Sequence, residues 1–348
     1  MSNENSGVVR MVINVGVNGL GVMGRHLIRA IKKQEKDGIL SKGEIEVVAF
    51  NDLFPAEQLA PLLKFDSVYG HFDGVVFSDG KDIRIDGKII DGSLERDVTK
   101  LDWEKRGVDI VYESTGYFAK KPGVEGHLKA GAKKVLISAP SNFAEKTFIM
   151  GVNSDKYNGE KIISNASCTT NCLAPLSLAL YKEIGPFSGL MTTIHAYTND
   201  QRLVDTPHED FARAYAAAFN LIPTTTGAAK AIGEVMPELD KKMNGLAIRA
   251  PVPSVSLVDL VVQFKKEVTK EGINEAVKRA AGSYLDGILN YRDGTIVSNM
   301  ILGNQYSSIF DSKQTMVVGN LAKVLSWYDN VVGYSHRTVD LIKLIGKK

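Results

Sequence analysis

Cysteine is scarce in this chain, whose 348 residues include only Cys168 and Cys172. Two thiols cannot build a disulfide framework. Apolar runs are also short, because none approaches the roughly 18–20 residues that a membrane span needs. The start, Met1–Gly7, is polar and lacks a hydrophobic signal core. We therefore expect a reduced, cytoplasmic protein that is neither exported nor bound to a membrane.

An excess of charge of one sign is missing as well. Lys and Arg total 42 against 40 for Asp and Glu, so the formal net charge is +2. Without a large basic excess, we do not expect nucleic acid or anionic lipid as a main partner. The composition is that of an ordinary globular protein, with 44% hydrophobic residues, and the length favours two domains.

The first half of the chain alternates short apolar runs with helical segments. We predict strands at Val12–Val17, Ile45–Phe50, Val108–Tyr112, Lys134–Ser138 and Phe148–Val152. A helical pattern runs from Met23 to Lys36, and the polar segment Gln34–Glu44 is predicted to be an exposed insertion. Almost continuously apolar strands that alternate with helices indicate a parallel sheet covered on both faces.

The second half has longer strands and fewer helices. The predicted strands are Gly189–Tyr197, Leu246–Arg249, Ser254–Phe264, Thr315–Val318 and Leu321–Tyr328. Gly319-Asn320, between the last two, is typical of a two-residue hairpin. The fold class is therefore α/β: a Rossmann-type doubly wound parallel sheet, followed by an α+β domain whose sheet is mostly antiparallel.

A glycine-rich loop follows the first strand and opens the first helix. Gly19, Gly21 and Gly24 have the spacing of the dinucleotide fingerprint, in which glycines allow pyrophosphate to approach the helix N-terminus. Asp52 ends the second strand, where a carboxylate can bind ribose hydroxyls and repel a 2′-phosphate. This context favours NAD over NADP. Taken without the loop, Asp52 is equally explained as a turn residue before Pro55.

The two cysteines precede or begin an apolar helical run, Leu173–Ile184. Cys168 would lie at the helix N-terminus, where the helix dipole favours thiolate. A zinc site held by these two cysteines would need further cysteine ligands, and the chain has none. The other alternative is a pair of buried structural thiols, which suits Cys172 better than Cys168. His195 lies within an apolar strand and is either an interior residue or the partner of Cys168.

Anion-binding groups are frequent in the same half. Hydroxyls, a glycine N–H and arginines could form a phosphate cradle from Thr198, Arg202, Arg213, Thr224–Gly227 and Arg249. Solvated surface arginines are the ordinary alternative. The segment Ala212–Ala218 is predicted to be helical from its intrinsic propensity.

Several segments, in order and across both halves, carry a resemblance to a known family. They are Gly16–Gly21, Val111–Gly116, Ile137–Ser141, Ala166–Pro175, His195–Thr198, Thr226–Lys230, Ser326–Asn330 and Gly333–Ser335. The most specific is Ala166-Ser-Cys-Thr-Thr-Asn-Cys-Leu-Ala-Pro175. Along almost its whole length, the chain closely resembles the phosphorylating glyceraldehyde-3-phosphate dehydrogenases.

The resemblance implies residue roles. Cys168 would be the nucleophile and His195 its base. The residues implied to contact NAD are Asn18, Gly19, Gly21, Val22, Met23, Asp52, Arg96, Ser138 and Asn330. Thr198 and Arg249 would hold the phosphate of D-glyceraldehyde 3-phosphate. Inorganic phosphate, or a second pose of the substrate, would contact Ser167, Thr169, Arg213, Thr226 and Gly227. No metal is expected.

The resemblance also implies how the chain is organised. Residues 1–167 would form the NAD-binding domain and residues 168–331 the catalytic domain, with a final helix at about 332–348 that packs back on the first domain. A homotetramer is implied, in which a loop of about residues 197–220 reaches a neighbouring subunit. That loop replaces the helix predicted for Ala212–Ala218.

Three places depart from the family. Val22 stands where an arginine is usual, Val331-Val332 replaces a glutamate and a bulky residue, and Tyr215 replaces an arginine that is frequent in bacterial relatives. These departures bear on cofactor affinity and cooperativity.

Two other functions remain open at this point. One is a sister dehydrogenase of another phosphorylated aldehyde, such as erythrose 4-phosphate, in which water resolves the thioester. The other is a protein that binds RNA in the nucleotide groove or uses Cys168 as an oxidation switch. Near-neutral charge makes nucleic acid binding at most a side activity.

Overall fold

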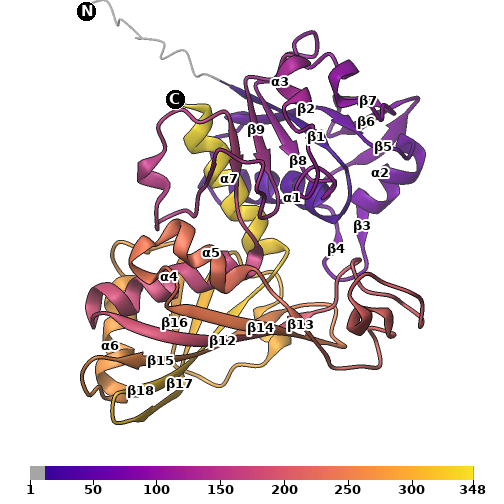
Figure 1. Cartoon of the computed structure of the whole chain (residues 1–348). Helices are drawn as coiled ribbons and strands as arrows, with labels where there is room; N and C mark the ends of the chain where they lie inside the picture. The colour runs from indigo at the N-terminus through magenta and orange to yellow at the C-terminus, as the bar shows by residue number, and fades with distance from the viewer. Residues whose placement is uncertain (1–11, 348) are drawn as a thin grey trace, which may run out of the picture.

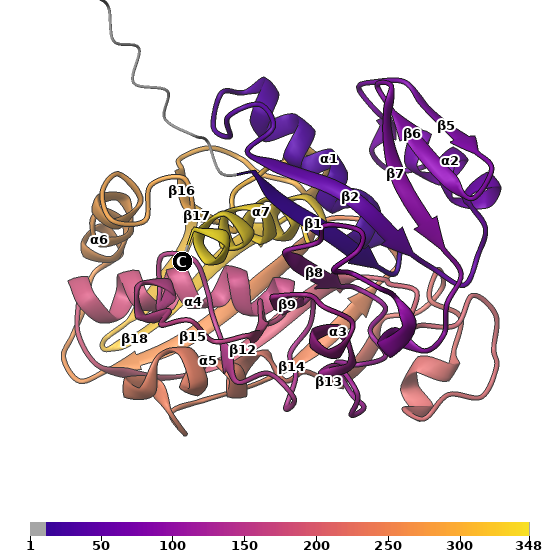
Figure 2. The ribbon, with the colours of Figure 1, turned by 90° about the horizontal axis from the view of Figure 1, so that it is seen from above.

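A computed structural model of the chain describes residues 12–347. The first half forms one body around a large sheet, and the second half forms another body below it in Figure 1. The C-terminal helix α7 (Val332–Gly346) lies between them and contacts α1 (Val22–Lys36) of the first body (Figures 1 and 2). Within residues 12–347, no helix is both long and apolar enough to span a membrane.

In the described part of the chain, the first sheet has nine strands in the order β10-β11-β9-β8-β1-β2-β7-β6-β5. From β10 to β7 neighbouring strands are parallel, and β5, β6 and β7 form an antiparallel edge. The bounds are β1 Ile13–Asn18, β2 Ile45–Asn51, β5 Val76–Asp79, β6 Asp82–Ile85, β7 Lys88–Ser93, β8 Ile110–Glu113, β9 Lys134–Ile137, β10 Lys146–Thr147 and β11 Ile162–Ser164. Helices α2 (Ala56–Lys64) and α3 (Gly126–Lys129) and the small hairpin β3 (Phe65–Asp66) and β4 (Gly70–His71) complete this half.

Most of the predicted strands of this half are confirmed, but the strand at Phe148–Val152 is wrong. The strand there is β10, which ends at Thr147, and the chain then turns. Phe148 is nevertheless fully buried, because its ring packs against Tyr157 in the core. The short apolar run at Phe148–Val152 therefore indicates a buried segment and not a strand.

The prediction that Gln34–Glu44 is exposed is also wrong in part. α1 continues to Lys36, and the Gln34 side chain donates to the His336 carbonyl oxygen and to Asp340 on α7. Leu40 is buried in the core, and Glu44 forms ion pairs with Lys343 and Lys347. The segment therefore fastens α7 to the first sheet.

In the same described range, the second sheet has seven strands in the order β13-β14-β12-β15-β18-β17-β16. Most neighbours are antiparallel, as predicted, whereas β12–β14 and β16–β17 are parallel. The bounds are β12 Phe187–Ala196, β13 Ile222–Thr225, β14 Met243–Ala250, β15 Ser256–Phe264, β16 Leu289–Arg292, β17 Ser308–Val318 and β18 Leu321–Tyr328. Helices α4 (Cys168–Glu183), α5 (Ala228–Val235) and α6 (Lys270–Ala281) pack over it around one apolar cluster.

Residues 197–220 form a loop with one short helical turn, Phe211–Ala214. The helix that propensity predicted for Ala212–Ala218 is therefore wrong, and the loop implied by the resemblance is present. The final helix contributes Val339, Ile342 and Ile345 to the core of the first sheet, which confirms that it packs back on this domain.

Exchange of His336 for Gln should make the free energy of unfolding less dependent on pH between 6.5 and 4. Burial, with a smaller contribution from Arg337, lowers the pKa of His336 from 6.5 to about 4. Between these values the unfolded chain binds a proton that the native chain does not, so native stability falls as the pH falls. One such group contributes a slope of about 1.4 kcal/mol per pH unit.

Denaturant unfolding across this pH window measures the slope. His71→Gln, which changes an exposed histidine of β4, is the matched control. Equal slopes in His336→Gln and in the control would contradict the assignment.

Candidate active site

The carboxyl ends of the parallel strands lie along one edge of the first sheet. They are Asn18 of β1, Asn51 of β2, Glu113 of β8, Ile137 of β9 and Ser164 of β11. Ligands of open α/β sheets bind outside this edge. Cys168 follows β11 within a few residues, so the chain itself brings this thiol to the edge that carries the glycine loop.

The glycine loop has the shape that a dinucleotide requires. Gly19 has a φ of +91°, and a Cβ there would lie 2.9 Å from Thr115. A Cβ on Gly24 would lie 2.3 Å from the carbonyl oxygen of Gly19, so α1 packs closely on the loop. Gly21 is the N-cap of α1 and supplies no side chain to the first N–H groups of the helix. These N–H groups are therefore available to a pyrophosphate, and the residues present fit NAD.

The other residues expected to contact NAD differ in how exposed their side chains are and in how many hydrogen bonds they already make. Asp52 accepts hydrogen bonds from the backbone N–H groups of Leu20, Leu53 and Phe54, which aim its carboxylate at the end of the loop. Val22, the first residue of α1, is exposed, and Met23 packs against the core.

Arg96 is exposed, and Ser138, partly buried, donates its N–H to Glu113. Asn330 is buried, and its side-chain oxygen accepts a hydrogen bond from Ser256. Of this group, Arg96 is the side chain that is most free to turn toward a ligand.

Asn18 belongs to a buried polar network that links three strand ends. Its Nδ2 donates to Glu113 at 2.6 Å, and its Oδ1 accepts from Asn51 at 2.8 Å. Glu113 also contacts His127 Nε2 at 3.1 Å, and Trp103 Nε1 donates to His127 Nδ1 at 3.0 Å. Since Nδ1 accepts, Nε2 carries the proton and donates to the carboxylate. The network holds the strand ends below the glycine loop in register.

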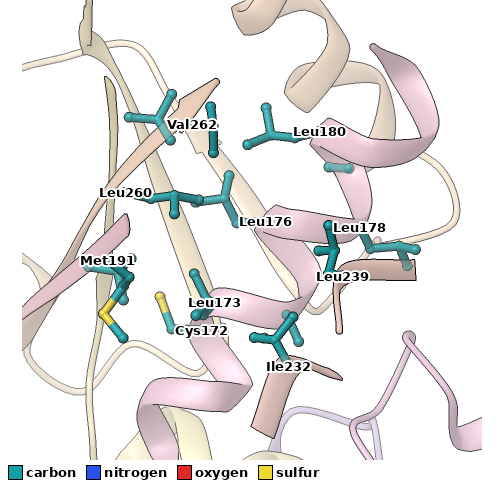
Figure 3. Packing of buried hydrophobic residues seen from close by; sticks show 14 of the residues in the cluster. Cys172, Leu173, Leu176, Leu178, Leu180, Met191, Ile232, Leu239, Leu260 and Val262 are labelled. Carbon is teal, nitrogen blue, oxygen red and sulfur yellow. The ribbon is translucent and has the colours of Figure 1, made fainter. Parts of the chain in front are cut away.

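Cys168 and Cys172 have different environments. Cys168 is the first residue of α4, as predicted, and the Ser167 hydroxyl caps this helix by accepting the Thr170 N–H. Cys172, one turn later, lies in the apolar core with Leu173 and Met191 (Figure 3). The structural-thiol interpretation therefore holds for Cys172 and fails for Cys168.

The Cys168 Sγ lies 3.4 Å from His195 Nε2. β12 carries His195, so the contact joins a helix start to a strand end. His195 Nδ1 lies 2.6 Å from the carbonyl oxygen of Ala196 and 2.9 Å from Arg249 Nη1. A carbonyl only accepts and a guanidinium only donates, so the two contacts call for opposite tautomers, and the shorter one favours the proton on Nδ1. Nε2 is then free to take a proton from the thiol, and Arg249 acts on the ring through its charge.

The charges of this pair are set mainly by burial. Burial, and then the charge of Arg249, lower the pKa of His195 from 6.5 to about 3. Burial raises the pKa of the Cys168 thiol, although Arg249 and the N-terminal groups of α4 oppose it. The sequence pattern predicted a thiolate. In the described chain, desolvation outweighs the helix N-terminus, and the resting pair is a thiol beside a neutral imidazole.

Two buried nitrogen donors, one on β14 and one in the loop after β12, have no partner among the described residues. They are Arg249 Nε and Gln201 Nε2. Arg249 faces His195 across β14 and β12, and Gln201 accepts the Thr198 N–H through its side-chain oxygen. Buried donors without partners are costly, and an anion at Arg249 Nε would satisfy that donor. The roles of Thr198 and Arg249 in phosphate binding stay predictions, and Gln201 was missed because a lone glutamine in a loop carries no motif.

The remaining phosphate candidates are partly engaged. Thr169 shares a hydrogen bond with the Tyr328 hydroxyl, and Thr226 accepts the Ala228 N–H at the start of α5. Gly227 is exposed, with open space where a side chain would be.

Arg213 forms ion pairs with Asp200 and Asp210 and donates to Thr224. Its charge is therefore already shared between carboxylates. Arg202 donates to the Pro207 carbonyl oxygen within its own loop.

Two supporting residues had no signal in the sequence. The Tyr328 hydroxyl contacts both Thr169 and Thr193 at 2.8 Å, and its ring meets His195 edge-on. Ser256 accepts the Ala196 N–H and donates to Asn330. Tyr328 packs against the His195 ring, and Ser256 holds the backbone of the next residue, Ala196. They belong to strands far along the chain, so only the folded sheet brings them to the site.

Comparison with known families agrees with this geometry. Residues 13–121 match the model of the glyceraldehyde 3-phosphate dehydrogenase NAD binding domain, and residues 167–330 match that of its C-terminal domain. The chain belongs to the glyceraldehyde-3-phosphate dehydrogenase family. It is thus an oxidoreductase whose cofactor is NAD.

Curated relatives match this dehydrogenase along nearly its full length. Glyceraldehyde-3-phosphate dehydrogenase 1 of Bacillus subtilis (strain 168) is 52% identical over 341 residues, which are 97% of this chain and 99% of the relative. The enzyme of Geobacillus stearothermophilus is 51% identical over 341 residues, with the same shares covered. That of Mycobacterium avium is 52% identical over 340 residues, again with 97% and 99% covered.

In the dehydrogenase, His195→Asn should lower kcat by roughly 10²–10⁴-fold, which is the usual contribution of a general base. Alkylation of Cys168 by iodoacetamide should slow as well, because the thiol loses its proton acceptor. Cys168→Ser should abolish NADH formation. Cys172→Ala is the control and should leave alkylation at one thiol per chain. Loss of alkylation in Cys172→Ala alone would overturn the assignment of the nucleophile.

Glu113→Gln should raise the KM for NAD by roughly tenfold, equivalent to about 1.4 kcal/mol, with little change in kcat. Glu113 Oε2 accepts from Asn18 and His127, and Oε1 accepts the Thr115 N–H, so the amide would place its NH2 group against donors on either side. Initial rates at varied NAD measure the split between KM and kcat. Glu125→Gln, on the exposed start of α3, is the control, and an equal KM in both variants would contradict the role of the network.

Proposed function

We propose that this dehydrogenase oxidises D-glyceraldehyde 3-phosphate to 1,3-bisphosphoglycerate, with Cys168 as nucleophile, His195 as base and inorganic phosphate as acceptor. The observation that carries the proposal is the 3.4 Å contact between Cys168 Sγ and His195 Nε2 at the edge that holds the glycine loop. Thioester chemistry needs a thiol beside a proton acceptor, and the positively charged Arg249 lies 2.9 Å from the same imidazole.

The first step is attack of Cys168 Sγ on the aldehyde carbon. His195 Nε2 accepts the thiol proton as the S–C bond forms and returns it to the carbonyl oxygen, which yields a hemithioacetal. The Cys168 N–H at the start of α4 and the imidazole would stabilise the oxyanion. Thr198 and Arg249 would hold the substrate phosphate. Its negative charge would offset that of Arg249 and so make His195 a stronger base.

The glycine loop, Asp52, Arg96, Ser138 and Asn330 would hold NAD. When bound, NAD supplies the hydride acceptor that oxidises the carbon attached to Cys168 to a thioester. His195 takes the hydroxyl proton in that step. Tyr328 and Ser256 keep the imidazole and Asn330 in place, so the base stays aligned as the ligand changes.

Inorganic phosphate would then attack the thioester. An oxygen–carbon bond forms, the C–S bond breaks, and Cys168 leaves as thiolate. Thr226, Gly227, Ser167 and Thr169 would position the phosphate, with Arg213 beside them. Exclusion of water preserves the energy of the thioester for the acyl phosphate.

Family membership does not favour the other functions considered above. An erythrose 4-phosphate dehydrogenase would form NADH at the same rate without phosphate. Binding of RNA, or an oxidation switch at Cys168, has no support beyond the nucleotide groove and a thiol that the proposed chemistry already uses.

We further propose a homotetramer. The loop of residues 197–220 and its surroundings expose large apolar side chains, including Leu203 at 82%, Phe211 at 74% and Phe219 at 89%. Such a group is unusual on a monomer and typical of a surface that another subunit covers. The same loop is the one expected to reach a neighbouring subunit's cofactor.

The domain boundary and location are also proposals. We place the boundary between residues 167 and 168, where the chain passes from β11 to α4, with the final helix returned to the first domain. A cytoplasmic location is supported by the two thiols, which are both free.

Thr226→Val should raise the KM for inorganic phosphate by roughly tenfold (about 1.4 kcal/mol), because it removes one donor to the acceptor site. The first-turnover burst of NADH should be unchanged, since the acceptor acts after oxidation. Stopped-flow and steady-state rates from D-glyceraldehyde 3-phosphate, with and without phosphate, measure both. Thr225→Val, at the exposed neighbouring residue, is the control. Steady NADH formation without phosphate would refute the acceptor.

A further inference from the structure

A short hairpin of the first body reaches across to the second one beside helix α7. The hairpin consists of β3 and β4, and the loop between these strands carries Tyr69 (Figure 1). The Tyr69 hydroxyl lies 2.8 Å from Asp329 Oδ1, directly after β18, and 3.0 Å from Ser254 Oγ, just before β15. A carboxylate can only accept, so Tyr69 donates to Asp329 and accepts the Ser254 hydroxyl. One side chain of the first body is thus hydrogen-bonded to two segments of the second.

The carboxylate of Asp329 fixes the turn between β18 and α7. Asp329 is 1% exposed. Besides the phenol, its Oδ1 accepts the N–H groups of Val331 and Val332, at 3.0 and 2.9 Å, and its Oδ2 accepts the Gly303 N–H at 2.8 Å. Both oxygens therefore have partners, and the next residue in the turn that they hold is Asn330.

Asn330 lies in this turn with part of its side chain already engaged. It is 7% exposed, and its Oδ1 accepts the Ser256 hydroxyl at 3.1 Å. Ser256 in turn accepts the N–H of Ala196, whose carbonyl oxygen contacts His195 Nδ1. The NH2 group is therefore the part of Asn330 that remains for a ligand.

The nicotinamide is the part of NAD that this NH2 group can meet. The hydride acceptor must reach the carbon attached to Cys168, and His195 lies 3.4 Å from the Cys168 sulfur. The nicotinamide end of the cofactor consequently lies on the side of His195. Asn330 is connected to that histidine through one serine and one backbone unit.

On its own side, Tyr69 is held against the helix that follows the glycine loop. Its N–H donates to Asp66 Oδ1 at 3.0 Å, and its ring meets the ring of His26 edge-on, with centroids 4.7 Å apart. His26 belongs to α1, is 2% exposed, and lies 3.3 Å from Asp66 Oδ2 through its Nε2. Burial, and then the charge of Asp329, raise the pKa of the Tyr69 phenol, so the hydroxyl keeps the proton that it donates. Tyr69 therefore links α1 to the turn that carries Asn330.

We propose that Tyr69 is a positioning residue for the nicotinamide end of NAD. Its hydrogen bond to Asp329 fixes the turn that directs the Asn330 amide. Its contact with α1 sets this turn relative to the glycine loop, so the sites for the two ends of the cofactor keep a fixed separation. This inference rests on the proposed contact between Asn330 and NAD.

Calorimetric titration of the full-length protein with NAD and with ADP-ribose, which lacks the nicotinamide, tests the inference. Tyr69→Phe keeps the ring against His26 and removes the hydroxyl. It should raise the Kd for NAD about tenfold, the usual contribution of one hydrogen bond to a charged group, and change the Kd for ADP-ribose less than about twofold. Tyr284→Phe removes a hydroxyl that lies 3.5 Å from Glu183, in the loop after α6, and is the matched control. Equal changes in both Kd values, or none, would overturn the inference, because a merely structural role affects both ligands alike.

The route through Asn330 has its own test. Asn330→Ala should itself weaken NAD relative to ADP-ribose, and Tyr69→Phe should add little further loss in that background. Additive losses would show that Tyr69 acts elsewhere, and would overturn the inference. An Asn330→Ala protein with the wild-type ratio of the two Kd values would instead refute the proposed contact between Asn330 and NAD, and with it this inference. Because the titrations measure binding alone, neither outcome depends on the proposed reaction at Cys168.

Discussion

The short crossing from β11 to α4 is the constraint on which the site depends. Ser164 ends the last strand of the first sheet, and Cys168 begins the helix that anchors the second. Between them Asn165 and Ala166 are fully buried, and Ala166 has a φ of +52°. Tyr334 donates to the Ala166 carbonyl oxygen, and Asn165 donates to Thr338. Helix α7 thus fixes the crossing, and the crossing fixes where the thiol meets the edge of the dinucleotide sheet.

The second half supplies the partners of that thiol through its sheet. β12 carries His195, its neighbour β14 carries Arg249, and β18 ends with Tyr328. Neighbouring strands hold these side chains in a fixed register, so the position of the His195 ring does not depend on a mobile loop. Low polarity around the pair keeps both partners neutral at rest.

Local sequence patterns were sufficient to predict the elements whose structure depends on neighbouring residues alone. The glycine loop, the helix after it and the hairpin at Gly319-Asn320 follow from turn chemistry and periodicity, and all are present. The apolar run that begins at Phe148 led to a wrong strand prediction, because a buried turn can be as apolar as a buried strand. Gln34–Glu44 was misjudged because its polar side chains find partners on α7, at the other end of the chain. The residue types alone left His195 either an interior residue or the partner of Cys168, because nothing local links positions on α4 and β12, and the family resemblance favoured the pair. Tyr328 and Ser256 were not found, because each acts through a neighbour that only the folded sheets bring near, whereas Gln201 was not found because a lone glutamine in a loop carries no motif.

The return of α7 has a consequence for biosynthesis. The core of the first sheet includes Val339, Leu341, Ile342 and Ile345, which are synthesised after every strand of the second half. The dinucleotide domain therefore cannot close its core while the second half is being made, although its own strands have been made long before. During that interval, the groove that receives α7 is an exposed apolar surface on the nascent chain. Closure of the first domain thus waits for synthesis of the second, and a chain that stops before α7 is left open where chaperones and proteases act.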